Sequence, residues 1–217
     1  MKNKSTIIST IICLLPIVLS VMLYPKLPTQ IAVHFNNAGV ADGYLPKAIA
    51  AFGMPVLFAA INLYVHFRIN LDPKNENISI SLKSFSRWMI PITSISVIPV
   101  TLMMATGKEI PITLIVQALA GTMVAICGNY LPKCKRNYTI GIKLPWTLNN
   151  DENWNKTHRF AGFVWVIGGF VILLNAFFSI SWFIMISMIA LIIILPFVYS
   201  YLFYQKQGKA VNKDGNY

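Results

Sequence analysis

Residues 128–162 read GNYLPKCKRNYTIGIKLPWTLNNDENWNKTHRFAG, and this is the longest polar stretch between two apolar runs of the chain. It holds two of the five tryptophans, Trp146 and Trp154, and six of the eighteen basic residues. Those six are Lys133, Lys135, Arg136, Lys143, Lys156 and Arg159. The apolar runs on either side are about twenty residues long, which a helix needs to cross the hydrocarbon layer of a membrane. This pattern predicts a polar loop between two membrane-spanning helices.

The composition of the whole chain is typical of an integral membrane protein. Of its 217 residues, 56% are hydrophobic and only 12% are charged, whereas a soluble domain carries about 25% charged residues. The net charge of +11 is distributed between apolar runs and not along one soluble face, which argues against a nucleic-acid partner. The three cysteines form no framework, so we expect them to pack and not to form disulfides.

Six apolar spans can be drawn, and none contains Asp, Glu, Lys or Arg. They cover Ser5–Tyr24, Ala48–Phe67, Trp88–Gly107, Ile110–Leu131, Phe160–Phe178 and Ser181–Tyr204. We therefore expect an all-α integral membrane protein with six transmembrane helices, a small folded outer loop and an ordered inner loop between helices four and five. We divide it into an N-terminal two-helix unit, residues 1–87, and a four-helix region, residues 88–217. The polar tail after Tyr204 is expected to be disordered.

The basic residues predict the orientation in the membrane. The N-terminal apolar run resembles a signal peptide, but it is about twenty residues long and has no small-residue cleavage site, so we interpret it as a retained first helix. With the N-terminus inside, fifteen basic residues are cytoplasmic and only Lys26, Lys47 and Lys108 are outside. This positive-inside bias predicts that both termini are cytoplasmic.

The two loops that flank the second span are predicted to differ. In the outer loop, 25–47, Ile31, Val33 and Phe35 alternate with other residues as in a short strand, and turn residues follow. We expect these three side chains to pack against helix ends, and His34 and Asp42 to form local hydrogen bonds and no metal site. The inner loop, 68–87, is polar and rich in Asn and Ser, and we interpret it as a solvated linker near anionic lipid.

The central loop has a predicted backbone course. Pro132 ends the fourth helix, and residues 139–144 run extended, with Gly141 permitting close approach. Pro145 then turns the chain and places Trp146 at the interface. We expect Trp146 to be ordered against the inner ends of spans four and five, together with Asn129, Lys133, Asn137 and Lys143. Thr147 or Asn149 caps a helix that continues into span five. Two interpretations stay open: an aromatic belt with basic anchors, and a loop docked on the bundle that makes a binding surface, which we slightly favour.

The sequence offers little support for catalysis. A metal site needs three or four converging ligands, and neither such a group nor a hydrolase triad or glycine-rich phosphate loop is evident. We expect no enzyme activity, no metal and no cofactor. His66, near the inner end of span two, is interpreted as an interfacial side chain, and Asn62, Gln117 and Asn175 as interhelical hydrogen-bonding groups. A small-residue pair, Gly121 and Ala125, is expected to let a neighbouring helix approach closely.

Three motifs resemble known sequence families. GNxxPKxKxNxxxGIKxPWTL over residues 128–148 and WxxTxRxxG over 154–162 are similar to the signature of the SdpI family, bacterial immunity proteins against a secreted peptide toxin. LPxxIxxHFNxxGxxDG over 27–43 resembles a domain of unknown function that often precedes the SdpI region. The chain departs from the family at Lys143 and Leu144, where Arg-Thr is more common; Lys keeps the charge but lacks the planar fork of Arg.

The resemblance implies a protein of the bacterial cell membrane that protects against a membrane-active peptide. It also implies signalling, in which a transcriptional repressor is held at the membrane. The partners expected are thus the toxin, a cytoplasmic repressor and membrane lipid. The alternatives are a small transporter or lipid-handling protein and, less favoured, a membrane enzyme using the inner loop. The candidate binding residues in the inner loop are Asn129, Pro132, Lys133, Lys135, Asn137, Gly141, Lys143, Pro145, Trp146, Thr147, Trp154, Thr157 and Arg159. Those in the outer loop are His34, Asn36, Gly39 and Asp42.

Overall fold

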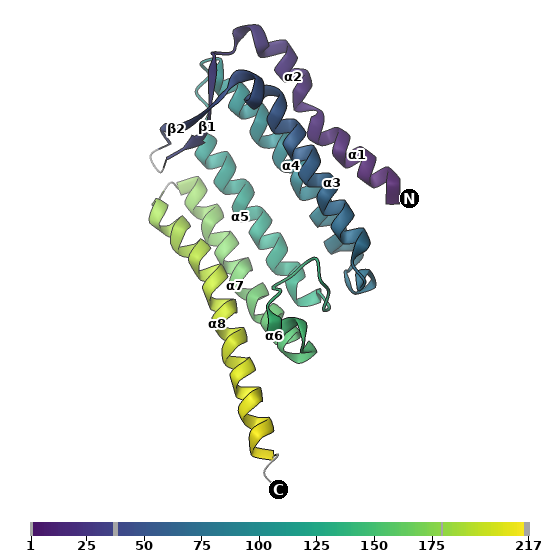
Figure 1. The fold of residues 1–217 in the computed structure, drawn as a ribbon. Coiled ribbons are helices and arrows are strands. Elements are labelled where there is room, and N and C mark those ends of the chain that lie inside the picture. The colour runs from purple at the N-terminus through teal and green to yellow at the C-terminus, as the bar shows by residue number, and fades with distance from the viewer. Residues whose placement is uncertain (1, 37–38, 179, 215–217) are drawn as a thin grey trace. The chain divides into compact units, whose positions relative to one another are not determined.

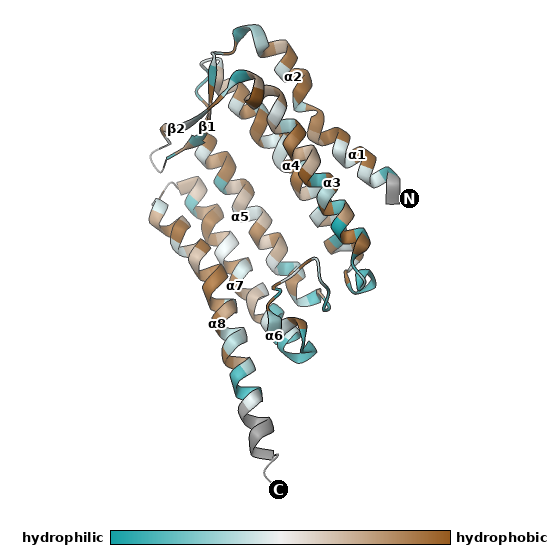
Figure 2. Cartoon of the chain, viewed as in Figure 1, coloured by the Kyte–Doolittle hydropathy of each residue, from teal (hydrophilic) through white to brown (hydrophobic). Residues whose placement is uncertain are grey.

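The computed structural model describes residues 2–36, 39–178 and 180–214, and most of this part of the chain is helical (Figure 1). Six of its helical segments are long and apolar enough to cross a membrane. They are Lys4–Lys26, Ile49–Leu71, Ile80–Ala105, Ile112–Lys133, Asp151–Phe178 and Trp182–Gly208. Figure 2 shows hydrophobic residues along the middle of these helices and hydrophilic residues mainly at their ends and in the loops. The predicted six-helix membrane fold is therefore confirmed.

The chain divides into two compact units. Unit 1 comprises Met1–Asn70 and Lys83–Leu119, and unit 2 comprises Leu71–Leu82 and Ala120–Tyr217. The elements of unit 1 are α1 (Lys2–Leu14), α2 (Pro16–Leu23), β1 (Gln30–Phe35), β2 (Ala41–Pro46), α3 (Met54–Leu71), most of α4 (Ile80–Ala105) and the start of α5 (Ile112–Tyr130). The elements of unit 2 are the rest of α5, α6 (Pro145–Leu148), α7 (Asp151–Phe178) and α8 (Trp182–Asp214).

The outer loop folds into a two-stranded antiparallel hairpin, with Ile31 paired to Leu45. Ile31 is buried with Leu27, Ala50, Ala51, Ile98 and Leu102, and Val33 packs against this cluster. The first strand was predicted from its alternating pattern, and the packing of Ile31 and Val33 is as expected. Phe35 is only half-buried. The second strand, Ala41–Pro46, contains Gly and Pro. Both residues are depleted in strands, so the sequence does not indicate a strand here.

Polar side chains join α1 to α3 inside unit 1. His66 is buried, with Nδ1 2.9 Å from Thr6 Oγ1 and Nε2 2.9 Å from Ser9 Oγ. Asn62 is also buried, and its Nδ2 donates to Ser9 Oγ at 2.9 Å and to Thr10 Oγ1 at 3.2 Å. The interhelical role predicted for Asn62 is confirmed. His66, interpreted from the sequence as an interfacial side chain, is covered by α1, which supplies hydroxyl partners to both ring nitrogens.

Small residues bring α5 and α7 into close contact in unit 2. A Cβ atom added to Gly121 would lie 2.8 Å from the carbonyl oxygen of Gly169, and one added to Gly169 would lie 2.5 Å from the amide nitrogen of Ala125. A Cβ added to Gly128 would lie 2.6 Å from the amide nitrogen of Val166. The close approach expected at Gly121 and Ala125 is confirmed, and it continues for two turns toward the central loop.

The last helix is longer than the sequence pattern indicates. It continues to Asp214, so the disordered tail expected after Tyr204 was wrong for the residues described. Gln207 helps to hold this extension, since its Oε1 accepts a hydrogen bond from Asn150 Nδ2 at 3.0 Å and its Nε2 donates to Glu152 Oε2 at 2.9 Å. Both partners belong to the region around the start of α7, which lies beside α8 in unit 2 (Figure 1).

Candidate functional site in the central loop

Trp154 forms the centre of the folded central loop. Its side chain is completely buried in a cluster with Ile78, Leu82 and Cys134. Its indole Nε1 donates to the carbonyl oxygen of Cys134 at 2.6 Å, and its ring stacks on that of His158 with centroids 4.0 Å apart. A buried tryptophan of this kind contributes a large apolar area and needs one acceptor for its N–H. Both requirements are met, so the loop has a packed interior of its own.

Gly141 passes directly over these two rings. Its φ of +122° lies in the region that favours glycine, and an added Cβ would lie 2.5 Å from His158 Nε2. The next residue, Ile142, donates its N–H to that same Nε2 at 2.9 Å, and His158 Nδ1 lies 2.8 Å from the carbonyl oxygen of Trp154. One neighbour can only donate and the other can only accept, so the ring is held as the neutral Nδ1–H tautomer. The close approach predicted at Gly141 is confirmed.

Asn137 determines the bends that precede Gly141. It is fully buried, and its Oδ1 accepts from the amides of Thr139 and Ile140 at 2.9 and 2.7 Å. Its Nδ2 donates to the carbonyl oxygen of Lys135 at 2.9 Å. Asn side chains that bond nearby amides compete with regular structure, and the chain bends from Tyr138 to Gly141. The extended run predicted over 139–144 was therefore wrong in its first half.

The inner loop between α3 and α4 docks on the central loop. Asp72 is buried, and its Oδ2 accepts from the amide of Tyr138 at 2.9 Å. Asn77 Nδ2 donates to the carbonyl oxygen of Arg136 at 2.6 Å, and Ile78 is buried beside Trp154. The solvated linker predicted here was wrong for Leu71–Leu82. The available signal was the pair of apolar residues Ile78 and Leu82 in a polar stretch; Ile78 is extended just before α4, and Leu82 lies in the first turn of that helix.

Trp146 is held by α8. Its Nε1 donates to Ser200 Oγ at 2.7 Å, and its ring contacts those of Phe197, Tyr201 and Tyr204. Ser200 Oγ donates in turn to Asn153 Oδ1 at 3.0 Å. We expected Trp146 against the inner ends of spans four and five. The short α6 that carries it contacts α7, which is span five, but its indole N–H finds its acceptor on span six. Asn153 and Ser200, both fully buried, were not identified from the sequence.

The helix caps also differ from those predicted. Thr147 Oγ1 accepts from the amide of Leu144 at 2.9 Å and donates to the carbonyl oxygen of Ile142 at 2.8 Å, which closes the short α6. Asn150 Oδ1 accepts from the amide of Asn153 at 2.9 Å, in the manner of an N-cap. Asn150 therefore caps α7, and neither Thr147 nor Asn149 does. The prediction that this helix continues into span five is confirmed, since α7 is uninterrupted from Asp151 to Phe178.

The candidate inner-loop residues separate into an interior group and a surface group. The buried or half-buried members are Asn137, Gly141, Trp146, Thr147, Trp154 and Thr157. The exposed members are Asn129, Pro132, Lys133, Lys135, Lys143, Pro145 and Arg159. The ring of Pro132 also meets α7, because a Cβ added to Gly162 would lie 2.6 Å from its Cγ. The interior group builds the loop, and the surface group is what a partner would contact.

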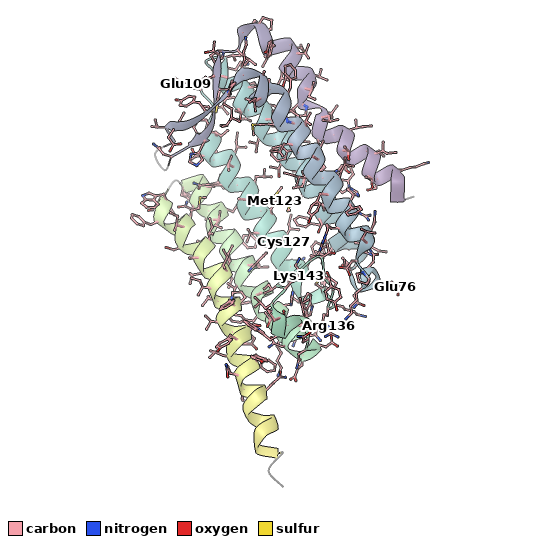
Figure 3. All side chains as sticks on the ribbon, in the orientation of Figure 1. Glu76, Glu109, Met123, Cys127, Arg136 and Lys143 are labelled. Carbon is pink, nitrogen blue, oxygen red and sulfur yellow. The ribbon has the colours of Figure 1, made fainter. Side chains whose placement is uncertain are left out.

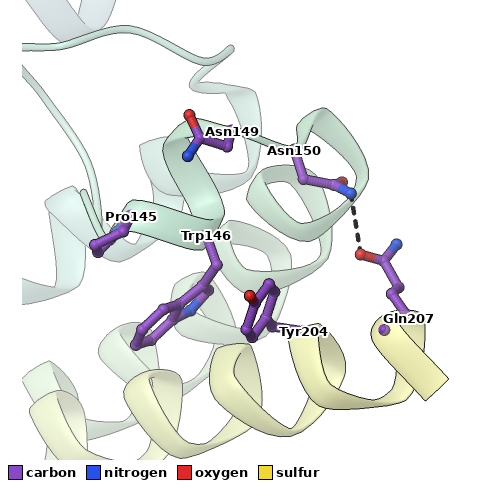
Figure 4. A pocket seen from close by; sticks show the side chains of 7 residues that line it. Pro145, Trp146, Asn149, Asn150, Tyr204 and Gln207 are labelled. Carbon is purple, nitrogen blue, oxygen red and sulfur yellow. Dashed lines mark hydrogen bonds between the residues drawn. The ribbon is translucent and has the colours of Figure 1, made fainter.

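A cavity of about 340 Å³ opens beside Trp146. We call it the Trp146 pocket, and its lining is Pro145, Trp146, Asn149, Asn150, Tyr204, Gln207 and Gly208. Figure 4 shows the Trp146 and Tyr204 rings close together, with the hydrogen bond between Asn150 and Gln207 at one side. The two rings stack with centroids 5.8 Å apart. Aromatic walls with uncharged amides suit an apolar side chain that is flanked by peptide groups.

The charges in and beside the central loop are partly paired. Arg136 Nε lies 2.7 Å from Asp151 Oδ1, and Lys156 Nζ lies 2.8 Å from Glu152 Oε1. Burial raises the pKa of the Cys134 thiol to about 11, so this cysteine stays protonated and is a poor nucleophile at neutral pH. Within the described residues, no three His, Cys, Asp or Glu side chains come together as metal ligands.

The outer-loop candidates lie in and around the hairpin turn. His34 Nδ1 is 2.5 Å from Asp42 Oδ1, with both side chains exposed to solvent, which is the local hydrogen bond expected for this pair. Asn36 Oδ1 accepts from the amide of Val40 at 3.1 Å. Gly39 has a φ of +75°, which the turn requires. These residues form the turn and present its outer surface.

Six membrane-crossing helices with a folded hairpin and an ordered polar loop define a multi-pass membrane protein. The model of the SdpI/YfhL protein family matches residues 133–200, and that of a domain of unknown function (DUF1648) matches residues 11–59. The immunity protein SdpI of Bacillus subtilis (strain 168) is 30% identical over 206 residues, which cover 94% of this chain and 97% of that protein. The chain belongs to the SdpI/YfhL family. No solved structure matches it.

Proposed function

We propose that this chain is a membrane immunity protein that protects its cell from a membrane-active peptide toxin. The observation that carries the proposal is its similarity to the immunity protein SdpI, which extends over 94% of the chain. The similarity therefore includes both the outer hairpin and the central loop. A toxin would meet the protein at the hairpin surface around Asp42 or within the bilayer.

The packing of the central loop supports recognition over simple anchoring. An aromatic belt requires only rings at the interface, whereas this loop buries Asn137, Thr147 and Trp154 completely. Buried polar groups are costly unless they are bonded, and each of these three side chains bonds the loop backbone. Such a structure presents its surface residues in fixed positions, which is what binding to a partner requires.

The cavity also favours recognition over transport. The Trp146 pocket is lined from α6 and the end of α8, where the apolar part of that helix gives way to Gln207 and Gly208. The polar groups at membrane depth are engaged elsewhere: Asn62 and His66 bond to α1, and Asn175 Oδ1 accepts from the amide of Ser181 at 3.0 Å. A transporter needs polar groups that converge on a cavity between its spans.

We infer that the central loop also holds a cytoplasmic protein, a transcriptional repressor, at the membrane. The Trp146 pocket has room for one apolar side chain of that partner. The exposed Lys133, Lys135 and Arg159 would attract acidic residues elsewhere on the partner. This part of the proposal requires the central loop to be cytoplasmic, as the positive-inside bias predicts.

Survival of toxin-exposed cells tests the proposal. Cells that carry the protein should survive a peptide toxin that kills cells without it. The triple variant Asn137→Ala, Lys143→Ala, Trp146→Ala should lose protection or signalling at normal membrane abundance. Trp182→Ala is the matched control, because this ring is partly exposed at the opposite end of α8. Full activity of the triple variant would show that the loop is an anchor and not a site.

Thiol labelling of intact cells tests the orientation. A cysteine at Val40, which is 59% exposed, should react with a membrane-impermeant maleimide, and one at Asn149 should react only after the cells are opened. The protein without added cysteines gives the baseline, since its Cys134 is buried. The opposite pattern would place the central loop outside and remove the cytoplasmic partner from the proposal.

A further inference from the structure

Two lysines from different segments meet at an exposed tyrosine. Tyr138 is 42% exposed; Lys74 Nζ lies 5.5 Å from the centroid of its ring, and Lys143 Nζ donates to its carbonyl oxygen at 3.4 Å. Both contacts are weak, so each ammonium group keeps donors for another acceptor. Among the described residues, the short ion pairs of this face are made by Arg136 and Lys156, and neither Lys74 nor Lys143 is paired with a carboxylate.

The backbone of Tyr138, beside which both lysines lie, is held in place by Asp72. Asp72 Oδ2 accepts from the amide of Tyr138 at 2.9 Å, and Asp72 Oδ1 accepts from the amide of Lys74 at 2.8 Å. The carboxylate is 6% exposed and directs its oxygens to these amides, so it positions both residues. Its charge offsets that of one of the two lysines, and among the described residues the exposed Glu76 makes no ion pair with either lysine. Asp72 and the two lysines together therefore keep a net positive charge.

The depth of this site relative to the membrane indicates what it meets. Lys74 is three residues beyond the end of α3 at Leu71, and three residues span about 11 Å at most. The polar headgroup layer on each side of a bilayer is about 5–7 Å thick. The Lys74 ammonium group therefore lies within or beside the headgroups, and Lys143 Nζ lies beside the same tyrosine.

We propose that Lys74, Tyr138 and Lys143 bind the phosphate of an anionic phospholipid in the membrane leaflet that faces the central loop. The two ammonium groups donate charge-assisted hydrogen bonds to phosphate oxygens, and the exposed phenol hydroxyl of Tyr138 supplies a further donor. A lipid is preferred to an acidic protein because the headgroup layer is already at the required depth. Bound lipid would add a further connection between the 71–82 segment and the central loop, beside the hydrogen bonds of Asn77 and Tyr138.

Native mass spectrometry of the full-length protein tests this site. The protein is reconstituted with phosphatidylcholine and phosphatidylglycerol, extracted into detergent, and analysed for retained lipid. We expect one tightly retained phosphatidylglycerol. In Lys74→Gln/Lys143→Gln its affinity should fall about 25-fold, because each lysine near a membrane surface contributes about a factor of five. The matched control is Lys4→Gln/Lys206→Gln, which removes the same charge from two other exposed side chains and should retain the lipid.

Two further arms make the result decisive. Lys143→Arg should increase retention, because a guanidinium group can bind a phosphate through two parallel hydrogen bonds. Inorganic phosphate at millimolar concentration should not displace the lipid. Equal loss in both double variants would reveal a diffuse attraction and overturn the site, and displacement by inorganic phosphate would overturn the lipid as its ligand. Each variant is compared for thermal stability, and loss of lipid with loss of folding would also overturn the proposal in favour of a structural role.

Discussion

Unit 1 and unit 2 hold their membrane helices together by different contacts. In unit 1, Ser9 on α1 lies 2.9 Å from both His66 Nε2 and Asn62 Nδ2 on α3. In unit 2, α5 and α7 meet through small residues, and a Cβ added to Gly169 would lie 2.5 Å from the Ala125 amide nitrogen. Lipid tails are as apolar as a helix surface, so membrane helices associate through close packing or through hydrogen bonds. Close packing at backbone distance leaves no room for a methyl group, whereas hydroxyl partners can reorient.

The two buried histidines show the same difference. His66 has the hydroxyl groups of Thr6 and Ser9 as partners, and each hydroxyl can either donate or accept. His158 lies between the Ile142 amide and the Trp154 carbonyl oxygen, and these groups have fixed roles. Unit 1 therefore tolerates exchange of hydrogen-bond roles, and unit 2 specifies one arrangement. We expect substitutions in unit 2 to have the larger effects.

The largest effect is expected at Gly141 in the central loop. Gly141→Ala adds a Cβ that would lie 2.5 Å from His158 Nε2, at a φ of +122° that L-residues rarely adopt. Backbone strain of this kind costs about 1–3 kcal/mol, and the overlap costs about 1–3 kcal/mol more. We expect loss of the packed loop, seen as Cys134 becoming reactive to a maleimide in detergent. Gly39→Ala is the control, because it has a positive φ but, among the described residues, its Cβ would meet only Thr113 Oγ1, at 3.7 Å.

If Gly141→Ala leaves Cys134 protected and the thermal midpoint unchanged, the central loop accommodates the added methyl group, and the strict packing of unit 2 does not extend to this loop. If Gly39→Ala exposes Cys134 to the same extent, the effect follows from a positive φ in general, and the contact with His158 does not explain it.

The second effect is expected where α5 meets α7. Gly169→Ala should destabilise unit 2 by about 1–3 kcal/mol, because backbone atoms of α5 occupy the space of the new methyl group. Gly208→Ala is the matched control: no atom that the structure describes lies within 4 Å of its Cβ position, and Ala is a better helix former than Gly by about 1 kcal/mol. Thermal unfolding in detergent should therefore shift in opposite directions for the two variants. If Gly169→Ala also raised the thermal midpoint, helix propensity would outweigh packing where α5 meets α7.

Local features of the fold could be predicted from the sequence. Apolar runs indicated the six spans, because the thickness of a bilayer imposes one length on every helix that crosses it. Alternation at Ile31 and Val33 indicated the first strand, and Gly141 indicated a close approach. Each of these features depends on a few neighbouring residues. The family signature likewise indicated membership that the comparison with SdpI confirms.

Partners distant in the sequence could not be predicted. The amide of Tyr138 bonds to Asp72, 66 positions earlier, and the indole of Trp146 bonds to Ser200, 54 positions later. The sequence indicates that Asp72 can accept hydrogen bonds and that Trp146 needs an acceptor, but many residues can fill either requirement. The packing of entire helices determines which residue becomes the hydrogen-bond partner. The sequence therefore indicated an ordered central loop, while the segments that support it, Leu71–Leu82 and α8, were missed.

The smallest effect is expected at the polar contact in unit 1. Asn62→Leu replaces the amide by an apolar group of similar size, and the Oδ1 atom that it removes is buried and has no hydrogen-bond partner among the described residues. Losing that unsatisfied acceptor offsets part of the cost of losing the bond to Ser9. Hydrogen bonds between membrane helices contribute about 0.6 kcal/mol on average. A double-mutant cycle of Ser9→Ala and Asn62→Leu, measured by unfolding in detergent, should therefore give a coupling free energy of about that size. A coupling above about 2 kcal/mol would make the hydroxyl contacts of unit 1 as strict as the glycine contacts of unit 2 and would remove the distinction between them.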